Sequence, residues 1–217
     1  MPRDGLADGA RARSGGRPPD PAKDDAILDG ARAAFFENGF AGATMEEVAA
    51  RAGVSKVTVY KRFADKESLF EAVVRREMSR MQREFETWPY ADGSLGERLN
   101  AYGSILLRFL FMTQHRLLDR MLANDLRHSP GMGRRFYDLG PGACRERIGA
   151  MLADAAARGE IQIDDPHLAS ADLFSLWAGA LQKELDFEVM DGVDGDEIDR
   201  RVRRGTRLFL KMTRPDR

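Results

Sequence analysis

The sequence is poor in residues that form covalent cross-links or metal sites. Its 217 residues include one cysteine, Cys144, so no disulfide can form within the chain, and a reducing cytoplasm is the expected location. The histidines are His115, His128 and His167, and they share no metal-ligand spacing with one another or with Cys144. We therefore expect neither a metal nor another cofactor.

Long apolar segments are missing as well. No apolar run approaches the roughly 18 residues of a membrane-spanning helix, so we expect no membrane partner. The first 25 residues have no apolar core, and we do not expect them to be a secretory leader.

The motifs of common enzyme classes are also absent. The sequence has no Gly-Xaa-Ser-Xaa-Gly elbow, Walker loop or dinucleotide fingerprint. Gly140-Pro141-Gly142 is too short a glycine pattern for a phosphate loop. Asp164 and Asp165 are better explained by helix capping than by paired acid–base catalysis. We expect a protein that is not an enzyme.

Positive and negative charges balance over the whole chain, but one segment has a local excess of bases. The 34 Lys+Arg oppose 35 Asp+Glu, and 43% hydrophobic with 32% charged residues fits a soluble globular protein. Between residues 51 and 66 the only acid is Asp65. The bases of that segment are Arg51, Lys56, Lys61, Arg62 and Lys66. A local basic surface of this kind suits nucleic acid, and the overall charge hides it.

The same segment carries the start and stop signals of two short helices. Thr44 and Glu47 have the spacing of a reciprocal capping box, and Ser55 can cap a second helix. Gly53 stands between them, where a turn between crossing helices needs a left-handed residue. Asp65 can cap a third helix that begins at residue 66. The pattern predicts a helix-turn-helix.

The second of these helices should have one buried and one exposed face. Val59 and Phe63 are four residues apart, so we expect both to point inward. In a helix-turn-helix the second helix enters the DNA major groove, and residues at helix N-termini favour phosphate. A lysine at position 61 can reach a guanine edge or a phosphate. The side chains that we predict to contact DNA are Thr44, Ser55, Lys56, Val57, Thr58, Tyr60, Lys61 and Lys66.

Two alternatives to DNA binding remain for this segment. It can be a plain helical corner with a solvated charged face, or it can bind another protein through the exposed Val57 and Tyr60. The salt dependence of binding distinguishes DNA binding from protein binding, because DNA binding weakens steeply as the salt concentration rises and an apolar protein contact does not.

Residues 25–74 resemble the N-terminal domain of TetR-family transcriptional regulators. The matching pieces are ILDGARAAFFENGF, ATMEEVAARAGVSKVTVYKRF and ADKESLFEAVV. A second segment, FYDLGPGACRERIGAMLADAAARGEIQIDDPHLASADLF, is similar to the AefR-like C-terminal domain of that family.

The resemblance implies a three-helix DNA-binding head and a larger helical body that binds a ligand and dimerises. It also implies repression that a small molecule relieves. The family's phosphate contacts fall on Thr44 and Lys66, and its base-reading helix carries the candidates between residues 56 and 61. Many relatives have glycine where this chain has Val57, so the family's base preference does not carry over to that position.

The expected organisation is all-α, with three parts. Residues 1–23 form a disordered arm, which either enters the minor groove or is an unstructured tail. Residues 24–75 form the helix-turn-helix head, and residues 76–217 the helical-bundle body. The predicted helices are 26–38, ending at Gly39, then 66–87, 95–112 and 116–127, then 131–158 split at 140–142, then one from 166 past Leu181, and a last one ending at about Met212.

The body offers candidates for an effector pocket. Spaces between bundle helices are commonly apolar with a few polar groups, so we expect an apolar or amphipathic small-molecule effector. The alternative for each residue is ordinary core. The pocket candidates are Trp88, Tyr102, Phe109, Met112, Met121, Phe136 and Trp177. Cys144 lies beside Arg145 and Arg147, so it is either a low-pKa redox sensor or a buried small hydrophobe.

The last two long helices are the candidates for a dimer interface. A homodimer is favoured because one short recognition helix binds DNA weakly, and two-fold symmetry matches a near-palindromic operator. The alternative is that these helices only close the core of the protomer. The interface candidates are Phe174, Leu181, Val202, Leu208 and Phe209.

Overall fold

The chain is helical throughout the part that the structure describes. The computed structural model describes residues 21–87, 93–113, 115–116, 118–119, 122 and 130–215. Its helices are α1 (Pro21–Gly42), α2 (Met45–Arg51), α3 (Lys56–Arg62), α4 (Lys66–Glu86), α5 (Leu95–Phe111), α7 (Pro130–Leu139), α8 (Pro141–Ala157), α9 (Pro166–Ala178), α10 (Leu181–Asp186) and α11 (Gly195–Met212). No strand occurs among these residues, and the predicted all-α fold is confirmed.

Some predictions lie outside the described residues or need a new boundary. The arm up to residue 20, most of the predicted helix 116–127, and the pocket candidates Trp88 and Met121 are not described. Helix α1 begins at Pro21, so residues 21–23 are helical and do not belong to the arm. Its regular geometry is interrupted at Gly39, where φ is 71°, as the predicted left-handed end of the helix requires.

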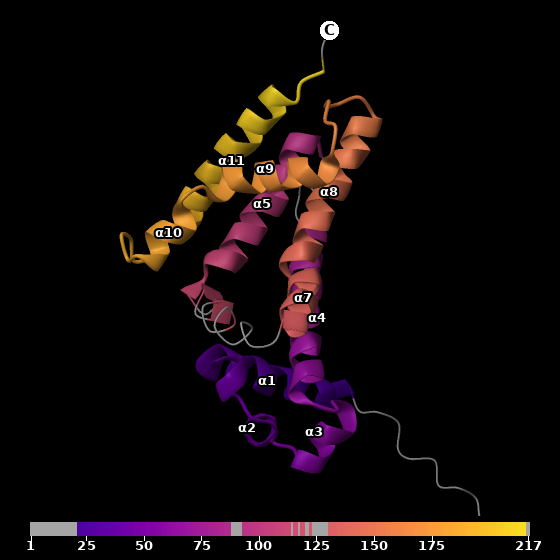
Figure 1. Ribbon diagram of the computed structural model, residues 1–217, viewed down its shortest axis with the longest axis vertical. Helices are drawn as coiled ribbons and strands as arrows, with labels where there is room; N and C mark the ends of the chain where they lie inside the picture. Colours follow the sequence, from indigo (N-terminus) through magenta and orange to yellow (C-terminus); the bar gives the residue numbers. More distant parts are fainter. Residues whose placement is uncertain are drawn as a thin grey trace, which may run out of the picture.

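Helices α1, α2 and α3 form a small head at the lower end of the molecule (Figure 1). Its core is built around Ile27, Phe35, Val48, Val59 and Phe70, which are all 0–1% exposed. Each of the three helices therefore turns its apolar side to this core, and the opposite sides of α2 and α3 are exposed.

Helix α4 leaves the head and runs up into the body (Figure 1). It starts with a reciprocal capping box, in which Asp65 accepts from the Ser68 amide at 2.7 Å and Ser68 accepts from the Asp65 amide at 3.3 Å. Its first turns contribute Phe70 to the core of the head, and its last turns contribute Met81 and Phe85 to the core of the body. The predicted boundary between residues 75 and 76 therefore falls inside one continuous helix.

The core of the body is organised around Trp177 of α9. Its indole lies between Gly103 of α5 and Gly205 of α11, and its Nε1 donates a hydrogen bond to Thr206 Oγ1 at 2.9 Å. A Cβ at position 205 would come within 2.7 Å of the Trp177 ring and 2.8 Å of the Leu176 carbonyl oxygen. The glycines thus allow α5, α9 and α11 to approach one tryptophan closely.

Two predicted helix ends can be compared with the structure. The split at residues 140–142 is confirmed, with α8 opening at Pro141. The prediction that the helix from Pro166 extends past Leu181 is wrong. Gly179 adopts φ 54°, which ends α9 at Ala178, and Leu181 begins the separate helix α10.

Three of the predicted dimer-interface residues are also corrected. Leu181, Val202 and Phe209 are 0–2% exposed and belong to the core of the protomer, so they are not available to a second copy. Phe174 and Leu208 are half-buried.

Candidate functional site

Side-chain caps hold the two short helices of the head in place. Thr44 Oγ1 accepts the Glu47 amide at 3.1 Å, and Ser55 Oγ accepts the Thr58 amide at 3.2 Å. Gly53 lies between the helices with φ 64°, so the tight turn uses the backbone freedom that glycine provides. These local bonds produce the helix-turn-helix that the sequence predicts.

The predicted reciprocal bond of the first cap does not form. The Glu47 carboxylate accepts instead from Asn38 Nδ2 and from Arg51 Nε, each at 2.9 Å. Arg51 also forms a two-pronged contact with Glu37, and these carboxylates raise the pKa of Arg51. The Arg51 guanidinium therefore ties α2 to α1 and is not part of the free basic surface.

Helix α3 separates its two faces as predicted. Val59 is fully buried, whereas Val57 is 62% exposed and Tyr60 is 44% exposed. Lys61 is exposed beside them. Phe63 is only half-buried, because it follows the last turn of α3 and packs at the edge of the core of the head. An exposed methyl, phenol and ammonium thus stand on one side of the helix.

The basic side chains of the segment differ in what they contact. Lys56 is paired with Glu46 of α2, which raises the pKa of Lys56, and Arg62 is paired with Asp24 at 2.8 Å. Lys61 has no hydrogen-bond or ion-pair partner among the residues that the structure describes. Its ammonium is therefore the one on α3 that can bind a phosphate or a base without first breaking an ion pair.

Lys66 forms contacts within the head in addition to its predicted phosphate contact. Its Nζ donates to the carbonyl oxygens of Ala41 and Ala43 at 3.0 Å each, and lies 4.7 Å from the centre of the Phe40 ring. An ammonium has three donors, so one remains after these two bonds. Lys66 thereby fixes the turn that presents the exposed Thr44, the other predicted phosphate contact.

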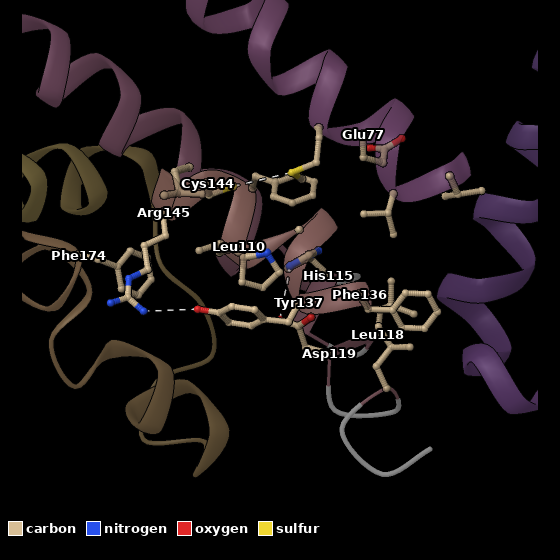
Figure 2. Close-up of a pocket in the computed structure, with 18 of the residues that line it drawn as sticks. Glu77, Leu110, His115, Leu118, Asp119, Phe136, Tyr137, Cys144, Arg145 and Phe174 are labelled. Atoms are coloured by element: carbon tan, nitrogen blue, oxygen red, sulfur yellow. Dashed lines mark hydrogen bonds and ion pairs between the residues drawn. The ribbon is translucent and has the colours of Figure 1, made fainter. Parts of the chain in front are cut away.

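A cavity of about 670 Å³ lies between the head and the body (Figure 2). Its wall is mainly apolar and comes from α1, α4, α5, α7, α8 and α9, and from residues 115, 118, 119 and 122. Aromatic rings form much of the wall: Phe35, Phe36, Phe70, Phe109, Phe136, Tyr137 and Phe174. The volume falls within the range of small-molecule sites.

Only some of the residues that line this cavity were predicted from the sequence. Phe109 and Phe136 line it, whereas Met112 does not, and Tyr102 and Trp177 are packed in the core of the body. Phe174, which was predicted for the dimer interface, lines the cavity. The contributions of α1 were missed, because its aromatic pair is indistinguishable in sequence from ordinary core of the head.

Phe136 of α7 joins the cavity to the core of the head. Its ring centre lies 4.4 Å from that of Phe70 and 5.8 Å from that of Phe40. Phe35 in turn packs edge-on against Phe70 at 4.9 Å. One continuous aromatic cluster therefore belongs to the head and to the cavity wall.

A few polar groups interrupt the apolar wall. Glu77 is 8% exposed and pairs with Arg32 of α1 at 3.2 Å. His115 Nε2 lies 3.5 Å from Asp119 Oδ2, and burial lowers the pKa of His115 and raises the pKa of Asp119.

Cys144 lines the cavity as well. Its thiol donates to the Met78 sulfur at 3.8 Å, and burial raises its pKa. That direction is opposite to the one a redox sensor requires.

Within the described ranges no three His, Cys, Asp or Glu side chains are grouped so that they could hold a metal ion. None of the helices described there is both long and apolar enough to span a membrane.

A helix-turn-helix whose second helix has an exposed face, joined through one long helix to a body with a cavity, is typical of a DNA-binding transcriptional regulator. Comparison with known families specifies the class further. The chain belongs to the TetR family. Residues 27–73 match the model described as bacterial regulatory proteins, tetR family, and residues 97–212 match the AefR-like transcriptional repressor, C-terminal domain. The family consists of regulators, which confirms the expectation of a protein that is not an enzyme.

Solved structures agree over nearly the whole chain. A TetR-family transcriptional regulator from Mesorhizobium loti is 29% identical, with a TM-score of 0.75 over 90% of this chain and 98% of its own. The flavonoid-responsive regulator FrrA is 29% identical, with a TM-score of 0.74 over 91% and 100%.

Curated relatives are similar over a shorter stretch. The repressor AcnR of Corynebacterium diphtheriae is 42% identical over 55 residues, which is 25% of this chain and 29% of AcnR. The activator FasR of Mycolicibacterium smegmatis is 36% identical over 69 residues, 32% of each chain. The chain thus spans about a third or less of the length of these relatives.

Proposed function

We propose that the protein is a homodimeric repressor that binds a near-palindromic operator and releases it when an apolar or amphipathic small molecule fills the cavity. The observation that carries the proposal is that the cavity is walled by the core of the head itself, through Phe35, Phe70 and Phe136. A ligand there cannot bind without touching the elements that set the position of α3.

The mechanism follows from the stiffness of α4. A ligand that pushes on Phe70 or Phe136 acts on the first turns of α4, and α4 connects directly to α3. Two protomers would place their recognition helices in successive major grooves, about 34–36 Å apart, and a small tilt of each head would change that spacing. Coupling of about 1–3 kcal/mol would change operator affinity roughly 5–150-fold.

The dimer would use the outer faces of α9 and α11. Leu168 of α9 and Met212 of α11 are 58% and 74% exposed, and Leu208 of α11 is half-buried. These side chains replace the three predicted ones that the core of the protomer has buried. Both helices stand at the end of the molecule away from the head, so pairing there would leave the two α3 helices free (Figure 1).

The relatives support ligand control and repression. AcnR is named a repressor and FrrA is named flavonoid-responsive, whereas FasR is named an activator. Repression is proposed here because the C-terminal match is to the AefR-like repressor domain.

Genome-fragment selection at near-physiological salt, followed by titration of the enriched site, tests DNA recognition. We expect a short two-fold-symmetric sequence bound at nanomolar strength. Lys61→Ala should weaken DNA binding. It should also lower the magnitude of the slope of log binding constant against log salt concentration by about 2 per dimer, because one phosphate contact is lost from each protomer. Lys183→Ala, an exposed lysine on α10, is the matched control. Unchanged binding by the Lys61 variant would mean that the reading face is assigned wrongly.

The ligand part of the proposal needs a separate test. A thermal-shift screen with hydrophobic and amphipathic compounds should find some that raise the melting temperature and also release the selected DNA. A screen that stays flat, or stabilising compounds that leave DNA binding unchanged, would count against release by ligand.

A further inference from the structure

The charged groups of the cavity are not all neutralised by the protein. We infer that the effector carries an anionic group, a carboxylate on an apolar body, and that Arg145 of α8 binds it. This inference rests on the proposed ligand-binding role of the cavity, and it specifies the chemistry of the ligand.

Neither of the acidic groups that the structure describes in the cavity wall forms an ion pair with Arg145. Glu77 is paired with Arg32 at 3.2 Å, and Asp119 faces His115 at 3.5 Å. Arg145 has no acidic partner among the residues that the structure describes. Among the described residues, Arg145 therefore presents to a ligand a positive charge that no protein carboxylate balances.

Arg145 forms two long hydrogen bonds, and both acceptors are uncharged groups. Its Nη1 donates to the Tyr137 hydroxyl at 3.5 Å, and its Nη2 donates to the His167 carbonyl oxygen at 3.4 Å. Both exceed the usual 2.7–3.2 Å of N–H···O bonds. Its Nε is buried and has no hydrogen-bond partner in the described structure. A guanidinium held in this way has donors available, and a carboxylate fits its fork in a two-pronged geometry.

The position of Arg145 also sets the orientation of the ligand. Figure 2 shows Arg145 with Phe174 and the Tyr137 hydroxyl on one side of the cavity, and Phe136 with Leu118 on the other. Phe136 and Leu118 belong to the core of the head. An amphipathic carboxylate would thus place its charge on Arg145 and its apolar end against the head. The Tyr137 hydroxyl, which now accepts from Arg145, can donate its own proton to the same carboxylate.

The test uses matched ligands that differ only in charge. Dodecanoate and biphenyl-4-carboxylate, each below its aggregation concentration, are compared with their methyl esters by calorimetry on the full chain. We expect at least one carboxylate to bind about 10- to 100-fold more tightly than its ester. Arg145→Gln should remove that preference and leave the ester affinity unchanged, and Arg145→Lys should restore part of it.

Arg158→Gln is the control, because this arginine caps the far end of α8, pairs with Asp154 and Glu160, and does not line the cavity. If neither carboxylate binds better than its ester, including the case in which neither binds, the inference is overturned. It is also overturned if Arg145→Gln keeps the full preference. The proposed function fails separately, when no compound of any charge releases the selected DNA.

Discussion

Gly205→Ala gives a prediction in which two physical effects have opposite signs. Position 205 lies in the middle of α11, where alanine in place of glycine should stabilise a helix by about 1 kcal/mol. The added Cβ, however, would lie 2.7 Å from the Trp177 ring and 2.8 Å from the Leu176 carbonyl oxygen. Overpacking costs about 1–3 kcal/mol, and the upper end applies because one neighbour is backbone that cannot rotate away. The net expectation is a loss of about 2 kcal/mol.

Thermal unfolding followed by circular dichroism measures this effect. For a chain of this size, a loss of about 2 kcal/mol corresponds to a melting temperature roughly 4–8 °C lower. Gly131→Ala is the matched control, since it lies in helix α7 with nothing within 4 Å of an added Cβ, and it should be neutral or stabilising. A Gly205→Ala variant as stable as the parent would refute the close approach of α9 and α11 around Trp177.

Three further predictions concern the head, its link to the cavity and the thiol. Phe136→Ala should lower the melting temperature and reduce the ligand-dependent change in operator affinity, measured by titration with and without ligand, because its ring joins the cavity to the core of the head. The Ser68 amide and hydroxyl lower the pKa of Asp65, so the carboxylate stabilises the fold above its unfolded pKa and this stability is lost as pH falls through the lower folded pKa. Asp65→Asn, which caps comparably, should flatten the decrease in melting temperature below about pH 4, and an unchanged pH profile would contradict this. Cys144 should react with iodoacetamide at pH 8 more slowly in the native protein than in urea, since burial raises its pKa, and equal rates would show that the thiol is not buried.

Local features of the fold could be predicted well from the sequence. The caps at Thr44, Ser55 and Asp65 and the turn at Gly53 depend on residues at most three positions apart, so their geometry is specified by short-range bonds. The exposed face of α3 followed from the same logic, because burying Val59 determines which side chains point outward.

Features that depend on tertiary packing could not be predicted from the sequence. Nothing local distinguishes Phe35, which lines the cavity from α1, from Trp177, which is sealed in the core of the body. Likewise, Glu47 has the spacing of a capping box, but Arg51 and Asn38 compete for its carboxylate once α1 and α2 pack together. Aromatic content therefore predicted that the body had a pocket, but it did not predict which helices would enclose it.

The aromatic contact at Phe136 bears on how regulators of this kind can be recombined. Because Phe136 and Leu118 complete the core of the head, residues 24–75 are not an interchangeable cassette. If these residues were joined to the body of another regulator, a different side chain would pack against Phe70 in place of Phe136. The core of the head would then contain a cavity or a steric clash. A chimera that binds this operator and responds to another compound would therefore have to keep α7 together with the head. It would then also keep the part of the cavity wall that α7 supplies.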